Sequence, residues 1–172
     1  MSHPELVYPP PAYTGEGGLA GATLHRADAA PDLGYRSGGT VHYLATRRST
    51  NGQFGLYRWT MSAAPGGPDP HFHRSISESF YVLSGTINLY DGNRWVDGNP
   101  GDFLFVPEGG VHGFSNESGA PAPMLILFAP GADREDYFQT LDRVGRGMVM
   151  DDEERASFYL RHDAFWLPKD DR

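Results

Sequence analysis

The sequence contains no cysteine, and it carries fewer basic than acidic residues. Without cysteine the chain can form neither a disulfide nor a thiolate metal site. Its 14 Lys and Arg residues against 22 Asp and Glu residues give a formal net charge of -8, and no basic cluster is larger than the pair Arg47 and Arg48. This charge balance argues against a nucleic acid or an anionic membrane as a partner.

Long apolar segments are also missing. No apolar run approaches the length of about 18 residues at which a transmembrane helix becomes a candidate. The first residues lack the charged-then-apolar pattern of a secretory signal. We therefore expect a cytoplasmic protein that does not insert into a membrane.

Turn-forming residues, in contrast, are frequent among the 172 residues. The chain has 22 Gly and 14 Pro, enough to separate many short strands. Runs with β-type alternation recur at a spacing of about eight to twelve residues, which is typical of an all-β sandwich or barrel. The predicted strands cover residues 22–26, 39–47, 54–61, a hairpin over 78–90 that turns at 84–85, and then 94–96, 102–106, 112–116 and 124–128.

The pattern changes after residue 130. Apolar residues at helical spacing predict a helix over 133–144, and an Asp cap with an apolar side predicts a second helix over 151–161. The aromatic segment 165–167 that follows is expected to cover a barrel mouth or a subunit interface. We divide the chain into an extended arm (1–21), a β-barrel (22–130) and a C-terminal helical extension packed on the barrel (131–172). His162 and its neighbour Asp163 are interpreted as a surface pair.

Two short runs contain side chains that suit a metal ion. His71 and His73 are two residues apart, so both leave the same face of an extended strand, and Glu78 follows shortly after. The second run ends in His112, after a Pro-Gly break. Imidazole suits Zn, Cu, Fe and Ni, and a carboxylate extends the set to harder ions such as Mn. Three His and one Glu therefore predict a single divalent transition-metal site whose ion (Fe, Mn, Ni, Cu, Co or Zn) the residues do not fix.

The spacing of these runs resembles the two motifs of single-domain cupins. The first motif, HxH, four residues, E, six residues and G, is matched by His71, His73, Glu78 and Gly85. The second motif, G, five residues, PxG, two residues, H, three residues and N, is matched by Gly101, Pro107, Gly109, His112 and Asn116. One position departs, because Pro65 stands where the family often has Gly. The resemblance implies an all-β double-stranded β-helix, the jelly-roll cupin barrel, with short C-terminal helices, and metal ligation by His71, His73, Glu78 and His112.

Two further segments resemble quercetinase-like monocupins. They are the Thr-Asn-Gly-Gln-Phe-Gly-Leu run at 50–56 and the Pro-Gly-Ala-Asp run at 130–133. This looser resemblance implies a small aromatic, flavonol-type or other enol-bearing substrate and ring cleavage by dioxygen. Glu78 would then be catalytic as well as a ligand, because it could swing to accept a substrate hydroxyl proton.

The apolar wall of the substrate pocket is expected to come from strand residues near the ligands. The candidates are Trp59, Phe80, Val82, Phe105 and Phe114. Two alternatives remain at this point: a zinc-dependent polyketide cyclase or isomerase, and a non-catalytic small-molecule-binding cupin. Barrels of this family often pair, and the aromatic C-terminal segment would suit a homodimer.

Overall fold

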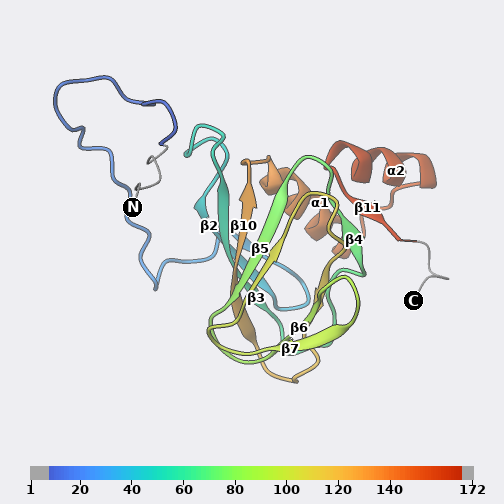
Figure 1. Ribbon diagram of the computed structural model, residues 1–172. Helices are drawn as coiled ribbons and strands as arrows, with labels where there is room; N and C mark the ends of the chain where they lie inside the picture. Colours follow the sequence, from blue (N-terminus) through green and yellow to red (C-terminus); the bar gives the residue numbers. More distant parts are fainter. Residues whose placement is uncertain (1–7, 168–172) are drawn as a thin grey trace, which may run out of the picture.

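Two antiparallel sheets face each other, and two helices cover one end of the space between them. The computed structural model describes residues 8–167 (Figure 1). The larger sheet has six strands in the order β1-β2-β3-β10-β5-β8, and the smaller has three in the order β7-β6-β9. The larger sheet contains β1 (Leu33–Gly34), β2 (Thr40–Ala45), β3 (Gly55–Met61), β10 (Ala122–Ala129), β5 (Ser77–Val82) and β8 (Phe103–Val106).

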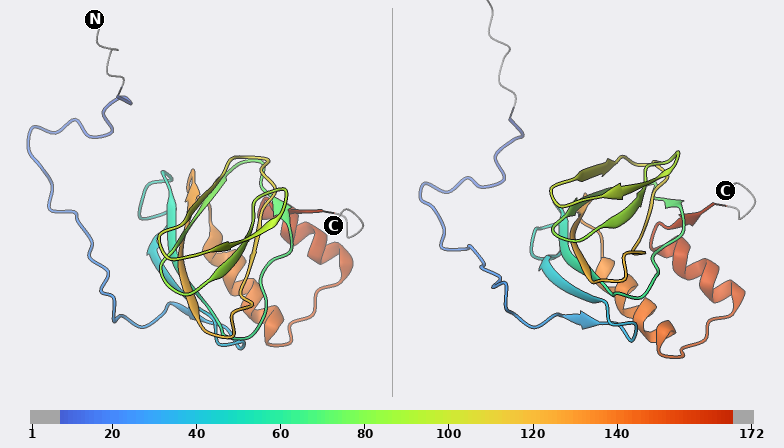
Figure 2. Two further views of the ribbon diagram at one scale, coloured as in Figure 1. Left: turned by 60° about the horizontal axis from the view of Figure 1, so that its bottom comes forward. Right: turned by 90° about the horizontal axis from the view of Figure 1, so that it is seen from below.

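The smaller sheet completes an all-β jelly roll. Its strands are β7 (Trp95–Gly98), β6 (Ile87–Tyr90) and β9 (Gly113–Ser115), and a separate two-stranded pair joins β4 (His71–Phe72) to β11 (Phe165–Trp166). Most of these strands lie at nearly the predicted positions. In the two views of Figure 2, an exposed segment from residue 8 to about residue 26 runs away from the body of the protein. Residues 27–32 return to it and are hydrogen-bonded to β2 and β3.

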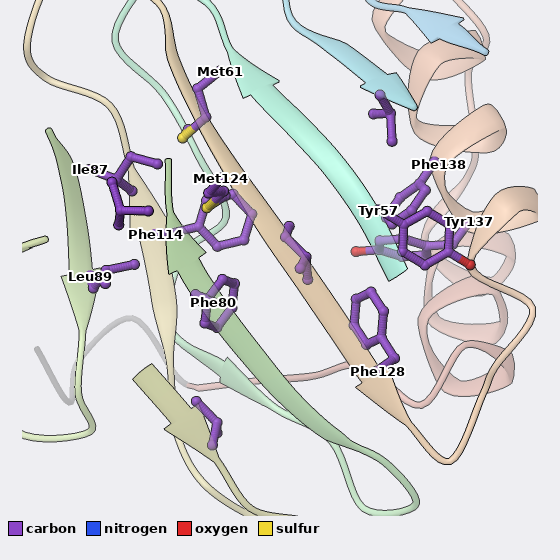
Figure 3. Packing of buried hydrophobic residues seen from close by; sticks show 14 of the residues in the cluster. Tyr57, Met61, Phe80, Ile87, Leu89, Phe114, Met124, Phe128, Tyr137 and Phe138 are labelled. Atoms are coloured by element: carbon purple, nitrogen blue, oxygen red, sulfur yellow. The ribbon is translucent and has the colours of Figure 1, made fainter. Parts of the chain in front are cut away.

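Strict alternation along the strands builds the core between the sheets. In β10 every second residue is buried, beginning with Ala122, so one face of this strand is wholly internal. The inward side chains of both sheets meet in one cluster (Figure 3). Phe80 and Met124 enter it from the larger sheet, and Ile87, Leu89 and Phe114 enter it from the smaller.

The two predicted helices are present as α1 (Arg134–Gly145) and α2 (Asp152–Arg161). A capping box begins α2, because Asp151 accepts from the backbone N–H of Glu154 while the Glu154 side chain accepts from that of Asp151. Helix α1 packs Phe138 against Tyr57 and Trp59, with ring centroids 5.2 and 5.0 Å apart. None of the described helices is both long enough and apolar enough to cross a membrane.

Two predictions of secondary structure are wrong. Residues 22–26 form no strand, because they are exposed and pair with no other described strand. The predicted hairpin at 84–85 is a corner instead: β5 pairs with β10 and β8, whereas β6 pairs with β7 and β9. Gly85, with φ of 72°, turns the chain from one sheet to the other. Turn chemistry alone does not distinguish a corner from a hairpin, because both need a left-handed residue.

Candidate metal centre and substrate cavity

The four predicted ligand residues converge from three separate segments. His71 begins β4, His73 follows that strand, Glu78 lies on β5, and His112 immediately precedes β9. Reciprocal backbone hydrogen bonds of 2.8 and 2.9 Å join His71 to His112. Each of the four residues offers a ligand atom, these atoms all lie within 4.8 Å of one another, and all four residues are buried.

A backbone carbonyl orients each imidazole. Nδ1 of His71 lies 2.9 Å from the carbonyl oxygen of Asp69, and Nδ1 of His112 lies 3.0 Å from that of Gly110. Nδ1 of His73 contacts the carbonyl oxygen of Asp163 at 2.5 Å. A carbonyl oxygen can only accept, so each Nδ1 carries the proton and each Nε2 keeps a lone pair.

The lone pairs of two imidazoles therefore face a carboxylate. Nε2 of His73 and Nε2 of His112 lie 3.1 and 2.9 Å from the same oxygen, Oε2 of Glu78. Acceptors brought this close in a buried space repel each other unless a proton or a metal ion lies between them. A metal ion meets this requirement, and carbonyl partners on the far nitrogens are the usual support of metal-bound histidines.

The electrostatics of His71 and Glu78 favour the protonation states of metal ligands, whereas Glu78 raises the pKa of His112 despite the burial of that imidazole. Burial, with His112 close by, lowers the pKa of His71 to about 3, so its imidazole stays neutral near pH 7. Burial by itself would raise the pKa of Glu78, but His112 and His73 beside it hold that pKa well below its usual value. A neutral imidazole and an ionised carboxylate are the forms that bind a divalent ion.

A cavity of about 360 Å³ opens beside this cluster, and His71 and Glu78 form part of its wall. Aromatic side chains make up much of the rest. They come from the larger sheet (Trp59 and Phe128), from the smaller sheet, from both helices and from β11 (Trp166). Pockets with apolar walls and a few converging polar groups are typical of small-molecule sites.

The predicted pocket residues occupy three kinds of position. Trp59 and Phe114 line the cavity. Phe80 and Val82 share the inner face of β5 with Glu78 but lie fully buried, where Phe80 packs on Phe114 with centroids 5.4 Å apart. Phe105 does not reach the cavity: it pairs with Ser79 on the outward face of β8 and is 57% exposed. Sequence alternation does not show which face of β8 points inward, because both of its faces carry apolar residues.

The C-terminal extension supplies cavity residues that the sequence did not identify as site residues. Arg134, Tyr137 and Phe138 come from α1, Tyr159 from α2 and Trp166 from β11. Trp166 lies against the imidazole of His71, with ring centroids 4.8 Å apart. The helical spacing of the aromatics predicted a buried face, but it gave no sign that this face borders the ligands.

Asp163 supports the metal centre and does not pair with His162. Its backbone adopts a left-handed conformation with φ of 55° just after α2, and its carbonyl accepts from His73. Its carboxylate accepts hydrogen bonds from the backbone N–H groups of Arg74 and Ser75, at 3.0 and 2.7 Å. His162 instead contacts Asp136, so the predicted surface pair is wrong. One residue thus fixes both the imidazole of His73 and the chain that follows it.

Comparisons with known proteins agree with this fold and site. The family model described as the cupin domain matches residues 59–128, which include all four clustered residues. Quercetin 2,3-dioxygenase of Bacillus subtilis is 32% identical over 130 residues, which cover 74% of this chain and 36% of that protein. The chain therefore spans about a third of the length of this curated relative.

Solved structures share the fold at lower sequence identity. A "predicted oxalate decarboxylase" of Thermotoga maritima superposes with a TM-score of 0.55 at 17% identity, covering 63% of this chain and 99% of that one. The polyketide cyclase RemF of Streptomyces resistomycificus gives 0.52 at 24% identity, covering 72% and 96%. Fold and site together define a jelly roll with a buried cluster of metal-competent side chains. The chain contains a cupin domain, since the family model matches residues 59–128 and the fold is that of a cupin jelly roll.

The first prediction concerns the carboxylate of the cluster. Glu78→Gln keeps the size of the side chain but removes its negative charge, so metal affinity should fall. Removing an outer hydrogen-bond partner of a ligand lowers metal affinity about tenfold to a hundredfold. Because Glu78 is itself a candidate ligand, we expect its loss to lower the affinity at least as much. Metal content by mass spectrometry and the metal-induced rise in Tm measure it. The exposed Glu117 provides the control Glu117→Gln, and equal metal retention by both variants would contradict the site.

The second prediction concerns the support of His73. Asp163→Ala removes the acceptor for two backbone N–H groups and disfavours the left-handed conformation, so metal affinity should fall by about tenfold or more. Asp163→Asn keeps a side-chain acceptor and tolerates that conformation, so it should retain most of the affinity. Competition with a metal-binding dye gives the affinities. A wild-type value for Asp163→Ala, with an unchanged fold by circular dichroism, would rule out this role.

Proposed function

We propose that this protein is a metal-dependent cupin enzyme that acts on a small aromatic or enol-bearing molecule, as a quercetinase-like dioxygenase. One observation carries the proposal: the buried cluster of three imidazoles and one carboxylate borders an aromatic cavity. The 32% identity to a protein named quercetin 2,3-dioxygenase supports the reaction class. A bound transition metal would supply Lewis acidity and, when redox-active, the electron transfer that oxygen chemistry requires.

The residues of this chain would hold and orient the substrate. Trp59, Phe114 and Phe128 offer apolar walls against which a planar ring can pack. Trp166 stands over His71, where it would limit the access of water to the cluster. Exclusion of water strengthens every electrostatic interaction inside the cavity.

Glu78 would move the proton. Its carboxylate borders the cavity, and its pKa lies well below the usual value, so it is ionised and able to accept a proton. An enol or phenol is more acidic than an ordinary alcohol, so it is the kind of hydroxyl that a carboxylate deprotonates most readily.

A zinc-dependent cyclase or isomerase of aromatic polyketide-like intermediates is the alternative. The same nitrogen-rich donor set suits zinc, and the same cavity would hold such an intermediate. A non-catalytic small-molecule-binding cupin would use the cavity without turnover. The three possibilities differ in whether oxygen is consumed and whether the ligand is converted.

The third prediction separates them. Protein loaded in turn with Fe, Mn, Ni, Cu, Co or Zn is incubated with flavonols and catechols in an oxygen electrode. We expect oxygen uptake with at least one redox-active metal and a loss of about a hundredfold or more in Glu78→Gln, which lacks both the ligand and the proton acceptor. Conversion without oxygen uptake would favour the cyclase. Binding with no conversion under any metal would favour the non-catalytic protein.

We also propose a homodimer, on a surface different from the one the sequence indicated. The aromatic C-terminal segment is used within the protomer, because Phe165 stacks on Phe72 with centroids 5.2 Å apart. Two exposed phenylalanines lie instead on β8, where Phe103 is 62% and Phe105 57% exposed. This strand is an edge of the larger sheet, so a second copy can pair with it about a two-fold axis.

The fourth prediction tests this edge. Phe103→Ser combined with Phe105→Ser should convert a dimer into a monomer, because it removes the apolar surface that a second copy would cover. Light scattering during size-exclusion chromatography measures the mass. Leu160→Ser, at a residue that is 66% exposed on α2, is the matched control and should leave the mass unchanged. A wild-type protein that is already monomeric would refute the proposal.

A further inference from the structure

The cavity contains a buried arginine whose charge no carboxylate of the described residues neutralises. Arg134, the first residue of α1, is 4% exposed and lines the cavity together with Glu78 and His71. Its Nη1 donates to the carbonyl oxygen of His162 at 3.1 Å. Its Nε is buried and has no hydrogen-bond partner. A buried cation without a counter-charge costs free energy that an anionic ligand in the cavity can recover.

The acidic neighbours of Arg134 are engaged elsewhere. Glu135 accepts from the hydroxyl of Tyr57 at 2.5 Å. Asp136 contacts His162 and lies near Arg143 and Arg161. Within residues 8–167 the ion pairs of the protein do not include Arg134.

Aromatic rings, rather than charges, surround the guanidinium. Its carbon lies 4.2 Å from the ring centroid of Tyr137 and 4.7 Å from that of Phe128. Burial raises the pKa of Tyr137 to about 12, so this phenol stays neutral near pH 7 and supplies no counter-charge. Figure 3 shows Phe128, Tyr137 and Phe138 converging where α1 meets the larger sheet. Ring faces hold the guanidinium in place but supply no counter-charge and no hydrogen-bond acceptor beyond the His162 carbonyl.

We infer that Arg134 binds a carboxylate of the substrate, so that the cavity selects an aromatic acid over its neutral counterpart. The planar guanidinium is suited to a carboxylate, because it can donate from more than one nitrogen. The substrate ring would lie between the aromatic walls, with its carboxylate at Arg134 and its reacting part toward His71 and Glu78. With a divalent ion bound, the cavity would carry net positive charge, which also favours an anion.

This inference rests on the proposed function only in that the cavity receives an aromatic substrate. It adds the chemical class of that substrate and does not depend on the reaction. Arg134 is a specificity-determining residue in this view, separate from the metal-binding cluster.

Two probes of equal shape and different charge test the inference. Isothermal titration calorimetry compares 2-naphthoate with 2-naphthamide on the full chain, both with its bound metal quantified and after chelator treatment. The acid should bind about tenfold to a hundredfold more tightly than the amide in both forms, the range expected for a hydrogen bond to a charged group. Equal affinities, or a preference that disappears with the metal, would overturn the inference.

Variants then assign the effect to Arg134. Arg134→Met should reduce the affinity for the acid to that for the amide, whereas Arg143→Met, on the exposed side of the same helix, should leave the preference intact. Arg134→Lys keeps the charge without the planar donors, so it should retain part of the preference. If Arg134→Met does not fold by circular dichroism, the lysine variant decides, and an undiminished preference there would refute the assignment.

The binding experiment and the oxygen-uptake experiment can fail independently of each other. Acid preference without oxygen uptake would leave Arg134 as the carboxylate site of a different reaction. Oxygen uptake with a neutral flavonol and no acid preference would support the dioxygenase and reject the role of Arg134.

Discussion

The structure depends on the convergence of three imidazoles on one buried carboxylate. Glu78 is placed among His71, His73 and His112, and their outer nitrogens are all held by backbone carbonyls. This arrangement directs lone pairs at an anionic oxygen among buried side chains. Such a cluster is unfavourable by itself and becomes favourable around a cation. The jelly roll can be understood as the framework that keeps these donors in position.

The C-terminal extension is part of the site and does more than close the barrel. It brings Trp166 over one ligand, Asp163 beneath another and Arg134 into the cavity wall. The contacts of Asp163 join it to His73 and Arg74, which lie about ninety positions earlier in the chain. A similar jelly roll with a different extension would keep the metal chemistry but present a different cavity. This separation of cluster and cavity fits the variety of reactions that one fold supports.

Particular residues show which features of the site and fold could be predicted from sequence patterns. The four residues that the resemblance to cupins implied as ligands do gather in space. Strand alternation accounts for the pair His71 and His73, because residues two apart on a strand leave the same face. The same alternation failed at Phe105, since a strand with apolar residues on both faces gives no phase. It failed again at Gly85, where a left-handed glycine serves a corner as well as a hairpin. Asp163 was missed because its role depends on a carbonyl and on two distant N–H groups.

The sequence by itself determined the strand pattern, the two helices and the identity of the donor residues, because these follow from local periodicity and side-chain chemistry. Only the tertiary structure decided which nitrogen of each imidazole is free, which aromatics border the cavity and that Arg134 is buried without a carboxylate partner. The physical reason is the separation along the chain between the residues that interact. Periodicity acts over a few residues, whereas tautomers, cavity walls and unpaired charges are set by contacts between segments that are distant along the chain.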